Sequence, residues 1–186
     1  MIAAPISSNP GASDAAAAAA ASCSLLRMAV GPEVLAVPIE SVREILEVGR
    51  LTALPRTPDF VRGVMNLRGA VVPVVDLSAR IGHGVSALGR RSCIVVVEVG
   101  GEAAEATHEG DYDAALVVGL LVDAVFEVFD TDSGAIETVP MLGTRIRADY
   151  LSGMTRARGE VIGILAVERV LSPADLAAAI ESHHAH

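Results

Sequence analysis

Residues 57–77 read TPDFVRGVMNLRGAVVPVVDL, and this stretch decides the fold. It predicts a strand at Met65 to Leu67, a tight turn at Arg68-Gly69 and a second strand at Ala70 to Leu77. Gly69 suits the turn because glycine accepts backbone conformations that other residues resist. Pro73 lies inside the apolar run and has no N–H to donate to a neighbouring strand, which predicts an edge strand or a bulge there.

On the N-terminal side, two apolar runs predict an opening hairpin. Leu25 to Val30 and Val34 to Ile39 flank Gly31-Pro32, a strong turn signal.

Two short helices are expected between this hairpin and the central stretch. Ser41 to Val48 is expected to form a helical turn that leads into a strand, with Ser41 as N-cap and Glu44 completing a capping box. Asp59 is expected to cap a second short helix over residues 60–64.

On the C-terminal side, two more apolar runs predict strands. They are Ser92 to Val99 and Ala115 to Val128, the latter with a bend near Asp123. Gly100 to Asp113 lies between them and is rich in acidic residues without any arginine, so we expect a solvated, mobile hairpin loop.

The end of the chain predicts a last hairpin and a helix. Tyr150 to Ala157 and Val161 to Val167 surround Arg158-Gly159, and Ser172 to Asp175 has the cap, proline and acid of a helix start before Leu176 to Ile180. About ten strands with one late helix and no βαβ alternation favour small β-barrels. There is no exact repeat, but two apolar hairpins of similar length are compatible with two sub-barrels.

Composition excludes several classes of function. The fourteen basic residues are all arginine and stand against 23 acidic ones, for a formal charge of −9, so we expect no nucleic-acid partner. The absence of lysine removes Schiff-base chemistry and the Walker A phosphate site. Outside the alanine tract, the longest apolar stretch is Ala114 to Val122, shorter than the ~20 residues of a membrane-spanning helix, so no membrane insertion is expected.

Cysteine usage and the N-terminal composition predict a cytoplasmic chain with a tail. Cys23 and Cys93 form no C-x-x-C motif, and no arginine precedes Arg27, so neither a disulfide framework nor a signal peptide is indicated. We expect a disordered alanine-rich tail at residues 1–23, one domain at 24–182 and a frayed terminus at 183–186.

The residues that usually carry catalysis or bind metals do not form a recognisable site. G-x-S-x-G, H-E-x-x-H and G-x-G-x-x-G are all absent, and His83 and His108 lie alone in expected loops. The histidines at 183, 184 and 186 are better explained as a frayed end than as a chelate. Residues 130–134 begin like a calcium loop, but Gly134 occupies the place of the third ligand. We therefore expect no enzyme activity, no cofactor and no metal.

The central stretch resembles the signature of the CheW family of chemotaxis coupling proteins. The matching positions are the run from Pro58 to Gly69, with its N-L-R-G, and the V-V-P-V-V-D-L at 71–77. Flanking matches, at residues 36–39, 42–45, 119–125 and 150–153, extend the resemblance over about Leu25 to Ala178.

The resemblance implies a fold, a function and partners. The fold is mainly all-β, with two intertwined five-stranded SH3-like β-barrels, short helices and a C-terminal helix. Family members are cytoplasmic adaptors without enzymatic activity. They bind the regulatory domain of the histidine kinase CheA and the cytoplasmic tip of methyl-accepting chemoreceptors, so that receptors are coupled to the kinase.

Carried over residue by residue, the resemblance assigns partner contact to Val42, Glu44, Ile45 and Arg68. Glu44 and Arg68 are expected to pair and to hold the loop after the short helix. Candidates for the receptor groove, which strand packing explains equally well, are Gly119, Val125 and Val128. Turn formation is the expected role of Asn66 and Gly69.

Some positions depart from the family pattern and leave the choice of partners open. Ser78 replaces a usual arginine, Val34-Leu35 replaces a common aromatic, and the acidic loop at 100–113 is long. The alternatives are an adaptor of a pilus-type or other non-motility chemosensory system, an adaptor that sequesters its partner, and an unrelated small-barrel ligand-binding module.

Overall fold

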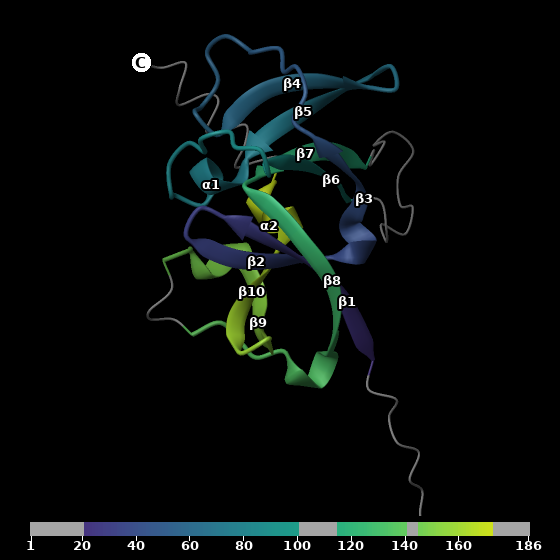
Figure 1. The fold of residues 1–186 in the computed structure, drawn as a ribbon, viewed down its shortest axis with the longest axis vertical. Coiled ribbons are helices and arrows are strands. Elements are labelled where there is room, and N and C mark those ends of the chain that lie inside the picture. Colours follow the sequence, from purple (N-terminus) through teal and green to yellow (C-terminus); the bar gives the residue numbers. More distant parts are fainter. Residues whose placement is uncertain (1–20, 101–114, 141–144, 173–186) are drawn as a thin grey trace, which may run out of the picture.

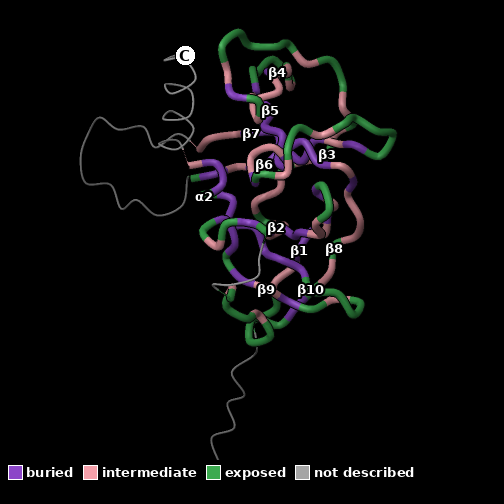
Figure 2. The backbone as a smooth tube through the Cα atoms, turned by 90° about the vertical axis from the view of Figure 1, so that its left-hand side faces the viewer, coloured by how far each residue is buried: buried purple, intermediate pink, exposed green. Residues whose placement is uncertain are grey.

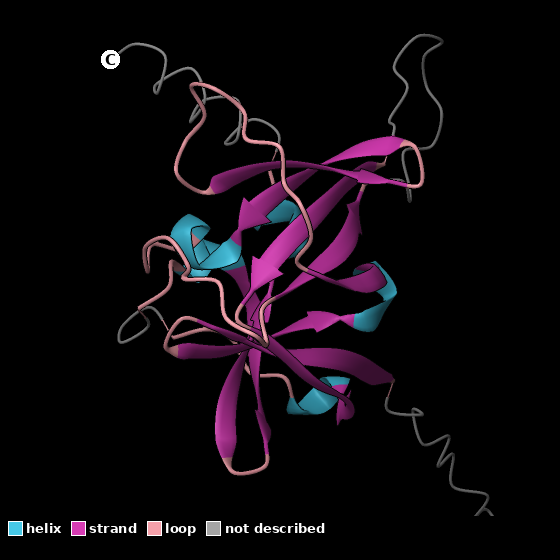
Figure 3. Ribbon diagram, turned by 45° about the horizontal axis from the view of Figure 1, so that its top comes forward, coloured by secondary structure: helices cyan, strands magenta, loops and turns pink. Residues whose placement is uncertain are grey.

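The computed structural model describes residues 21–100, 115–140 and 145–172, and it places ten strands in two five-stranded sheets. Sheet A has the order β8-β1-β2-β10-β9, and sheet B has the order β3-β6-β7-β5-β4. Figure 1 shows sheet B above sheet A, and Figure 3 shows how far strands dominate over helices. The two five-stranded sheets expected for this chain are therefore present.

The strands of sheet A are β1 (Ser22–Val30), β2 (Glu33–Pro38), β8 (Ala124–Asp132), β9 (Leu151–Ala157) and β10 (Glu160–Leu165). Those of sheet B are β3 (Val42–Glu47), β4 (Val61–Leu67), β5 (Ala70–Asp76), β6 (Cys93–Val99) and β7 (Leu116–Val122). The helices are α1 (Leu77–Arg80) and α2 (Val167–Val170), with 3₁₀ turns η1 (Ile39–Ser41), η2 (Ser133–Ala135) and η3 (Ala148–Tyr150).

The two sheets are intertwined along the chain. The chain builds β1 and β2 of sheet A, then all of sheet B, and returns to sheet A at β8. The return takes place at Asp123, where the expected bend separates β7 from β8 and sends them to different sheets. The half built on sheet A is therefore discontinuous in sequence, and the half built on sheet B, from β3 to β7, is inserted into it.

The main hydrophobic core lies between the sheets. Met28 and Leu35 of sheet A and Val97 and Leu120 of sheet B belong to one buried cluster, and Figure 2 shows the buried backbone running through the middle of the molecule. Each sheet also has a smaller cluster of its own, around Leu25 in sheet A and Ile94 in sheet B. Strands such as β6 are buried on both faces, which explains their unbroken apolar sequences.

Both helices expected near the central stretch are wrong. Ser41 ends η1 instead of capping a helix, and Val42–Glu47 forms β3, whose residues alternate between half-buried and exposed and pair with β6. Residues 61–64 belong to β4, where Val64 bridges Thr52. In both cases the neighbouring strand decides the conformation, because local helix signals are weak compared with sheet pairing.

Pro73 lies on an interior strand, not on an edge strand of the sheet order. Strand β5 pairs with β4 along its length but with β7 only from Val74 to Asp76, so Pro73 precedes the second ladder. The irregularity of this hairpin lies on β4, between Val61 and Gly63. The missing N–H of Pro73 is therefore tolerated because one side of β5 is still open there.

The sheets are consistent with the expected barrels but are not closed. Among the described residues, β3 and β4 do not pair with each other, nor do β8 and β9. An isolated bridge covers the outer edge of β4 at Thr52–Val64, and another covers β9 at Glu137–Met154.

Several expectations concern residues outside the described ranges. They are the tail up to residue 20, most of the loop at 100–113, the helix at 176–180 and the terminal histidines. Strand β1 begins at Ser22, so the expected tail overlaps it by two residues.

The two halves are structurally equivalent, which the sequence reading missed. The orders of the two sheets correspond strand for strand: β8, β1, β2, β10 and β9 take the places of β3, β6, β7, β5 and β4. In each sheet the third and fourth strands form a parallel pair, β2 with β10 and β7 with β5. Residues 61–81 recur ninety positions later, at 151–171, where four identities align: Gly63, Arg68, Gly69 and Val71 with Gly153, Arg158, Gly159 and Val161. The N-terminal hairpin therefore completes a half whose other strands are C-terminal.

Candidate functional site

The signature stretch forms the hairpin of β4 and β5, and Arg68 and Gly69 are the two residues of its turn. Both have positive φ, 51° and 88°, as in a two-residue type I′ turn. Asn66 stabilises the turn by accepting a hydrogen bond from the Gly69 N–H at 3.0 Å on Oδ1. Asn66 and Gly69 thus lie where turn-forming residues were expected.

The turn projects Arg68 towards β3, where its guanidinium meets Glu44. Arg68 Nη2 donates to Glu44 Oε2 at 3.0 Å, and the side chains are 79% and 21% exposed. Glu44 belongs to strand β3, so the pair joins the hairpin tip to a sheet edge rather than holding a loop after a helix. An exposed pair of this kind contributes about 0–1 kcal/mol to stability, so stability alone does not explain it.

Exposed apolar side chains lie close to this ion pair. Glu44, Arg68 and Val71 line a groove of about 620 Å³, which residues 115–117 also line. Val71 is 69% exposed and Ile45, next to Glu44 on β3, is 43% exposed. Val42 is half-buried and packs against the main core. We call Glu44, Ile45, Arg68 and Val71 the first site.

An equivalent set of residues lies in the other half. Arg158, at the turn of β9 and β10, has φ 51°, and its Nε lies 2.9 Å from Oε1 of Glu127 on β8. Val128 on β8 and Val161 on β10 are exposed, as Ile45 and Val71 are. We call Glu127, Val128, Arg158 and Val161 the second site. Its sequence signal was the recurrence of G-x₄-R-G at Gly63 and Gly153.

The remaining candidates are divided between the two halves. Gly119 is buried in β7, and a Cβ there would come within 2.7 Å of Ile94 Cγ2. Close packing against Ile94 therefore explains why this position is a glycine. Val125 is half-buried and Val128 is 49% exposed, and both lie on edge strand β8 of sheet A. A role of these three residues in receptor contact stays a prediction.

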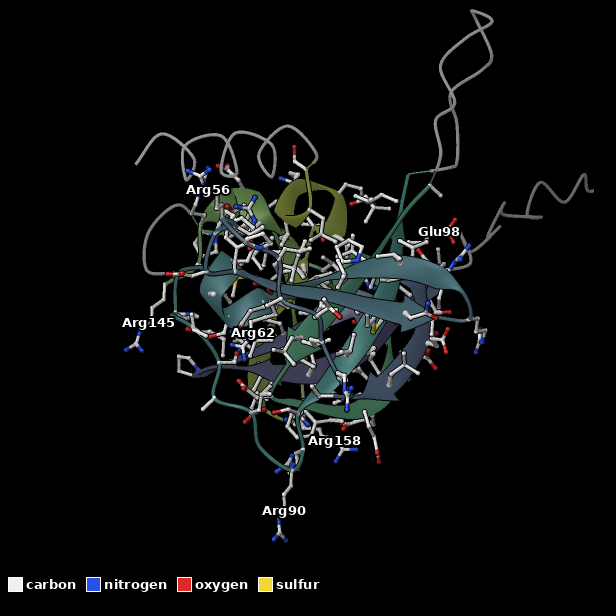
Figure 4. The ribbon with its side chains drawn as sticks, turned by 90° about the horizontal axis from the view of Figure 1, so that it is seen from above. Arg56, Arg62, Arg90, Glu98, Arg145 and Arg158 are labelled. Carbon is white, nitrogen blue, oxygen red and sulfur yellow. The ribbon has the colours of Figure 1, made fainter. Side chains whose placement is uncertain are left out.

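A buried network supports the base of the signature hairpin, and the sequence reading assigned it no role. Asp76 is fully buried and accepts hydrogen bonds from Arg62 Nη1 at 3.2 Å, from Ser86 N and Oγ at 2.8 Å each, and from the Ala79 N–H as N-cap of α1. An aspartate directly before a helix is a capping signal that could have revealed it. Figure 4 shows Arg62 close to the body of the molecule, whereas Arg90 extends outward.

Arg80 connects the two halves. Its guanidinium lies 5.0 Å from the ring of Phe60 and 5.3 Å from the ring of Tyr150, two aromatics at equivalent positions. Its Nε donates to the Val170 carbonyl at 2.8 Å, across to α2. Arg80 therefore contacts both halves.

None of the helices in the described ranges is both long and apolar enough to cross a bilayer.

Comparisons with known proteins agree with this geometry. The model of the CheW-like domain matches residues 24–175. A probable chemotaxis protein CheW of Rhizobium etli is 31% identical over 155 residues, covering 83% of this chain and 91% of the relative. The chemotaxis protein CheW of Rhizobium meliloti is 32% identical over 146 residues, covering 78% and 85%. The crystal structure of scaffolding protein TtCheW from Thermoanaerobacter tengcongensis matches with a TM-score of 0.66 at 29% identity, over 79% of this chain and 86% of that one. These names denote chemotaxis and scaffolding proteins, and no enzymatic activity is named among them.

Proposed function

The chain belongs to the CheW-like domain family, and on that premise we propose that it is a scaffold that couples chemoreceptors to the histidine kinase CheA. The two Rhizobium relatives, which match over most of the chain, are named chemotaxis proteins, which favours a chemotaxis array over a pilus-type system. Membership of this family also argues against the alternative of an unrelated small-barrel ligand-binding module. In this proposal the protein acts in the cytoplasm, without enzymatic activity or cofactor.

The first site is the proposed contact for the regulatory domain of CheA. The observation that carries this is the Arg68–Glu44 pair, presented at a two-residue turn whose strands β3 and β5 also carry the exposed side chains of Ile45 and Val71. Interface energy is concentrated in a few anchors that combine apolar burial with directed polar contacts, and arginine is among the most frequent of them. Val42 lies on the same strand as Glu44 and packs against the main core.

The receptor contact is proposed at strand β8 of sheet A. Val125 and Val128 lie on this edge strand, and Val128 offers its side chain to solvent. A receptor tip is a helical coiled coil, which binds by laying apolar side chains against an exposed apolar surface. The two partners would then occupy different halves, as coupling requires.

Calorimetric titration against CheA tests the first site. We expect Arg68→Ala to lower the affinity by ~1–3 kcal/mol, a hot-spot effect, and to change the free energy of unfolding by less than about 1 kcal/mol. Glu44→Ala should also weaken binding, and the double variant should lose less than the sum of the two, because the residues act through each other.

Arg158→Ala is the matched control, since it removes the same residue from the equivalent turn and should leave CheA affinity unchanged. A receptor fragment titrated against Val128→Asp tests the β8 contact. Unchanged affinities in the Arg68 and Glu44 variants, together with a large loss of stability, would assign the pair a structural role and contradict the proposed function.

A further inference from the structure

In the described part of the chain, the residues other than glycine that have a positive φ are all arginines. They are Arg56, Arg68 and Arg158, with φ of 57°, 51° and 51°. Side chains are rarely found in this conformation, and residues held in it cluster at binding and active sites. Arg68 and Arg158 lie in hairpin turns, where they contact Glu44 and Glu127. Arg56 lies in the loop between β3 and β4 and belongs to neither site.

The turn that contains Arg56 has a backbone that favours a different residue. Pro55 and Arg56 are its two central residues. Proline suits the first central position because its φ is fixed, whereas a positive φ at the second position is typical of glycine or asparagine. Arginine lacks the short polar side chain that makes this conformation acceptable to asparagine. Arg56 therefore lowers the stability of the fold, and the contacts around the turn must impose its conformation.

Contacts on both sides of the turn determine its conformation. On the N-terminal side, Thr52 exchanges two backbone hydrogen bonds with strand β4, at 2.8 and 2.9 Å. On the C-terminal side, Pro58 is buried, and its carbonyl accepts a hydrogen bond from the Val61 N–H at 2.9 Å. Thr57 Oγ1 closes the turn by donating to the Leu54 carbonyl at 3.1 Å. The turn is thus presented from a loop that is fixed at both ends.

The side chain of Arg56 has no partner among the described residues. It is exposed and forms no hydrogen bond, ion pair or ring contact with any of them, and Figure 4 shows it at the periphery of the molecule. Arg50 in the same loop is also exposed, and the loop has one acidic residue, Asp59, which forms no ion pair with Arg56. Leu54, two residues before Arg56, is 41% exposed. The loop therefore presents an unpaired guanidinium together with an exposed aliphatic side chain.

An acidic group is the chemical complement of this surface. A guanidinium has parallel N–H donors that match the two oxygens of a carboxylate, and it stays charged at every physiological pH. Arginine combined with an apolar neighbour is a frequent composition of interface anchors. Since no described residue supplies a carboxylate to Arg56, the turn fits a partner that brings one together with an apolar side chain.

The loop continues the surface that carries the first site. It connects β3, which holds Glu44, to β4, which ends at the turn of Arg68. Figure 1 shows the loop above sheet B, at the opposite end of β4 from that turn. Strand β4 has 7 residues and is therefore roughly 20 Å long. An interface of standard size, with about 800 Å² per partner, is about 30 Å across, so one partner can cover both places.

We propose that the Arg56 turn is an additional contact for CheA, at which an acidic group of the kinase binds the Arg56 guanidinium. The costly backbone of Arg56 is then retained for binding, and CheA lies along β4 from the first site to this turn. The inference rests on the proposed function, because it takes CheA as the partner of the first site.

Calorimetric titration with CheA and thermal unfolding of the same full-length variants test the inference. Arg56→Gly removes the charge and relieves the backbone, so we expect the affinity for CheA to fall about tenfold while the melting temperature rises by about 2–4 °C. Arg56→Lys keeps the charge and the backbone cost, so it should bind more tightly than Arg56→Gly and melt like the native chain. Arg56→Glu should bind most weakly, because it places a negative charge opposite an acidic group.

Arg90→Ala is the matched control, since Arg90 is also exposed without an ion pair among the described residues and lies away from Arg56 in Figure 4. It should bind CheA as the native chain does, and a receptor fragment should bind Arg56→Gly and the native chain equally well.

Several outcomes would overturn the inference. They are an unchanged affinity of Arg56→Gly for CheA, a fall in its melting temperature, an equal loss in Arg90→Ala, an affinity of Arg56→Glu no lower than that of Arg56→Gly, and a loss of receptor binding in place of CheA binding. Failure of the native chain to bind CheA at all would instead overturn the proposed function, and the inference with it.

Discussion

The half built on sheet B and the half built on sheet A reach the same backbone with different side chains. In both, the residue before the short helix donates its N–H to an aromatic residue's carbonyl: Asp76 to Phe60 at 2.7 Å and Ala166 to Tyr150 at 2.8 Å. At this position sheet B's half adds a buried polar network, because Asp76 carries a carboxylate and Ala166 does not. The difference shows that backbone pairing and apolar packing are common to both halves, whereas the polar groups distinguish them.

Asp76 should show the largest difference. Removing its carboxylate in Asp76→Ala leaves Arg62 and Ser86 without their buried partner, and we expect the free energy of unfolding to fall by about 3–5 kcal/mol. Urea denaturation measures this, and Asp76→Asn, which keeps the shape, should lose less. A loss below 1 kcal/mol would mean that the Asp76 network contributes little to stability, so that the sheet B half is as stable without it as the sheet A half is with Ala166 at the equivalent position.

The equivalent glycines Gly63 and Gly153 should respond unequally. A Cβ on Gly63 would lie 2.3 Å from the Thr52 carbonyl oxygen at φ 132°, whereas one on Gly153 would lie 2.5 Å from Ile136 Cγ2, a side-chain atom that can move. We expect Gly63→Ala to destabilise by about 3 kcal/mol or more and Gly153→Ala by about 1–2 kcal/mol. Thermal unfolding of the two variants compares them, and equal shifts would remove this distinction between the halves.

Arg80 should affect the contact between the halves rather than either one alone. Arg80→Met removes two cation–π contacts and a hydrogen bond to the Val170 carbonyl, so we expect a loss of about 2 kcal/mol. Hydrogen exchange should show the loss on both sheets. Faster exchange confined to sheet B would contradict a joining role.

Glu127 should give the smallest effect, and one that depends on pH. Its pKa is lowered on folding, first by a hydrogen bond from its own backbone N–H and, against an opposing effect of burial, by the charges of Arg158 and Arg27. Its charged form therefore favours the folded state above pH ~4.5, and this contribution is lost as the pH falls through the folded pKa. Glu127→Gln should therefore be less stable than the native chain at neutral pH and equally stable in strong acid. A stability difference that is constant from pH 7 to pH 3 would exclude this linkage.

The turns and most strands could be predicted from sequence because their signals are local. Gly31, Gly69 and Gly159 mark hairpin turns, and each lies between two strands. The apolar runs of β6 and β7 are long enough to indicate strands without knowledge of their neighbours. The helical turn expected at the start of residues 41–48 and the helix expected over 60–64 were wrong, because the strand conformation found there depends on pairing with residues distant in the chain.

The candidate site was predictable in part. The pairing of Arg68 with Glu44 followed from the resemblance to a family, and the structure places the two side chains in contact. The second site was missed, since its residues lie outside the signature stretch and the repeat that connects the two preserves only four residues in twenty-one.

By itself, the sequence determined the strands' apolar character, the positions of the turns and the family to which the chain belongs, because these depend on neighbouring residues and on a fixed order of motifs. Only the tertiary structure decided which charges meet. Arg27 contacts Glu127 and Glu160, which are 100 and 133 residues away, because β1 pairs with β8 and the β9–β10 turn closes over them. The charges around the second site are therefore a property of the intertwined sheets, which bring together residues that no local pattern connects.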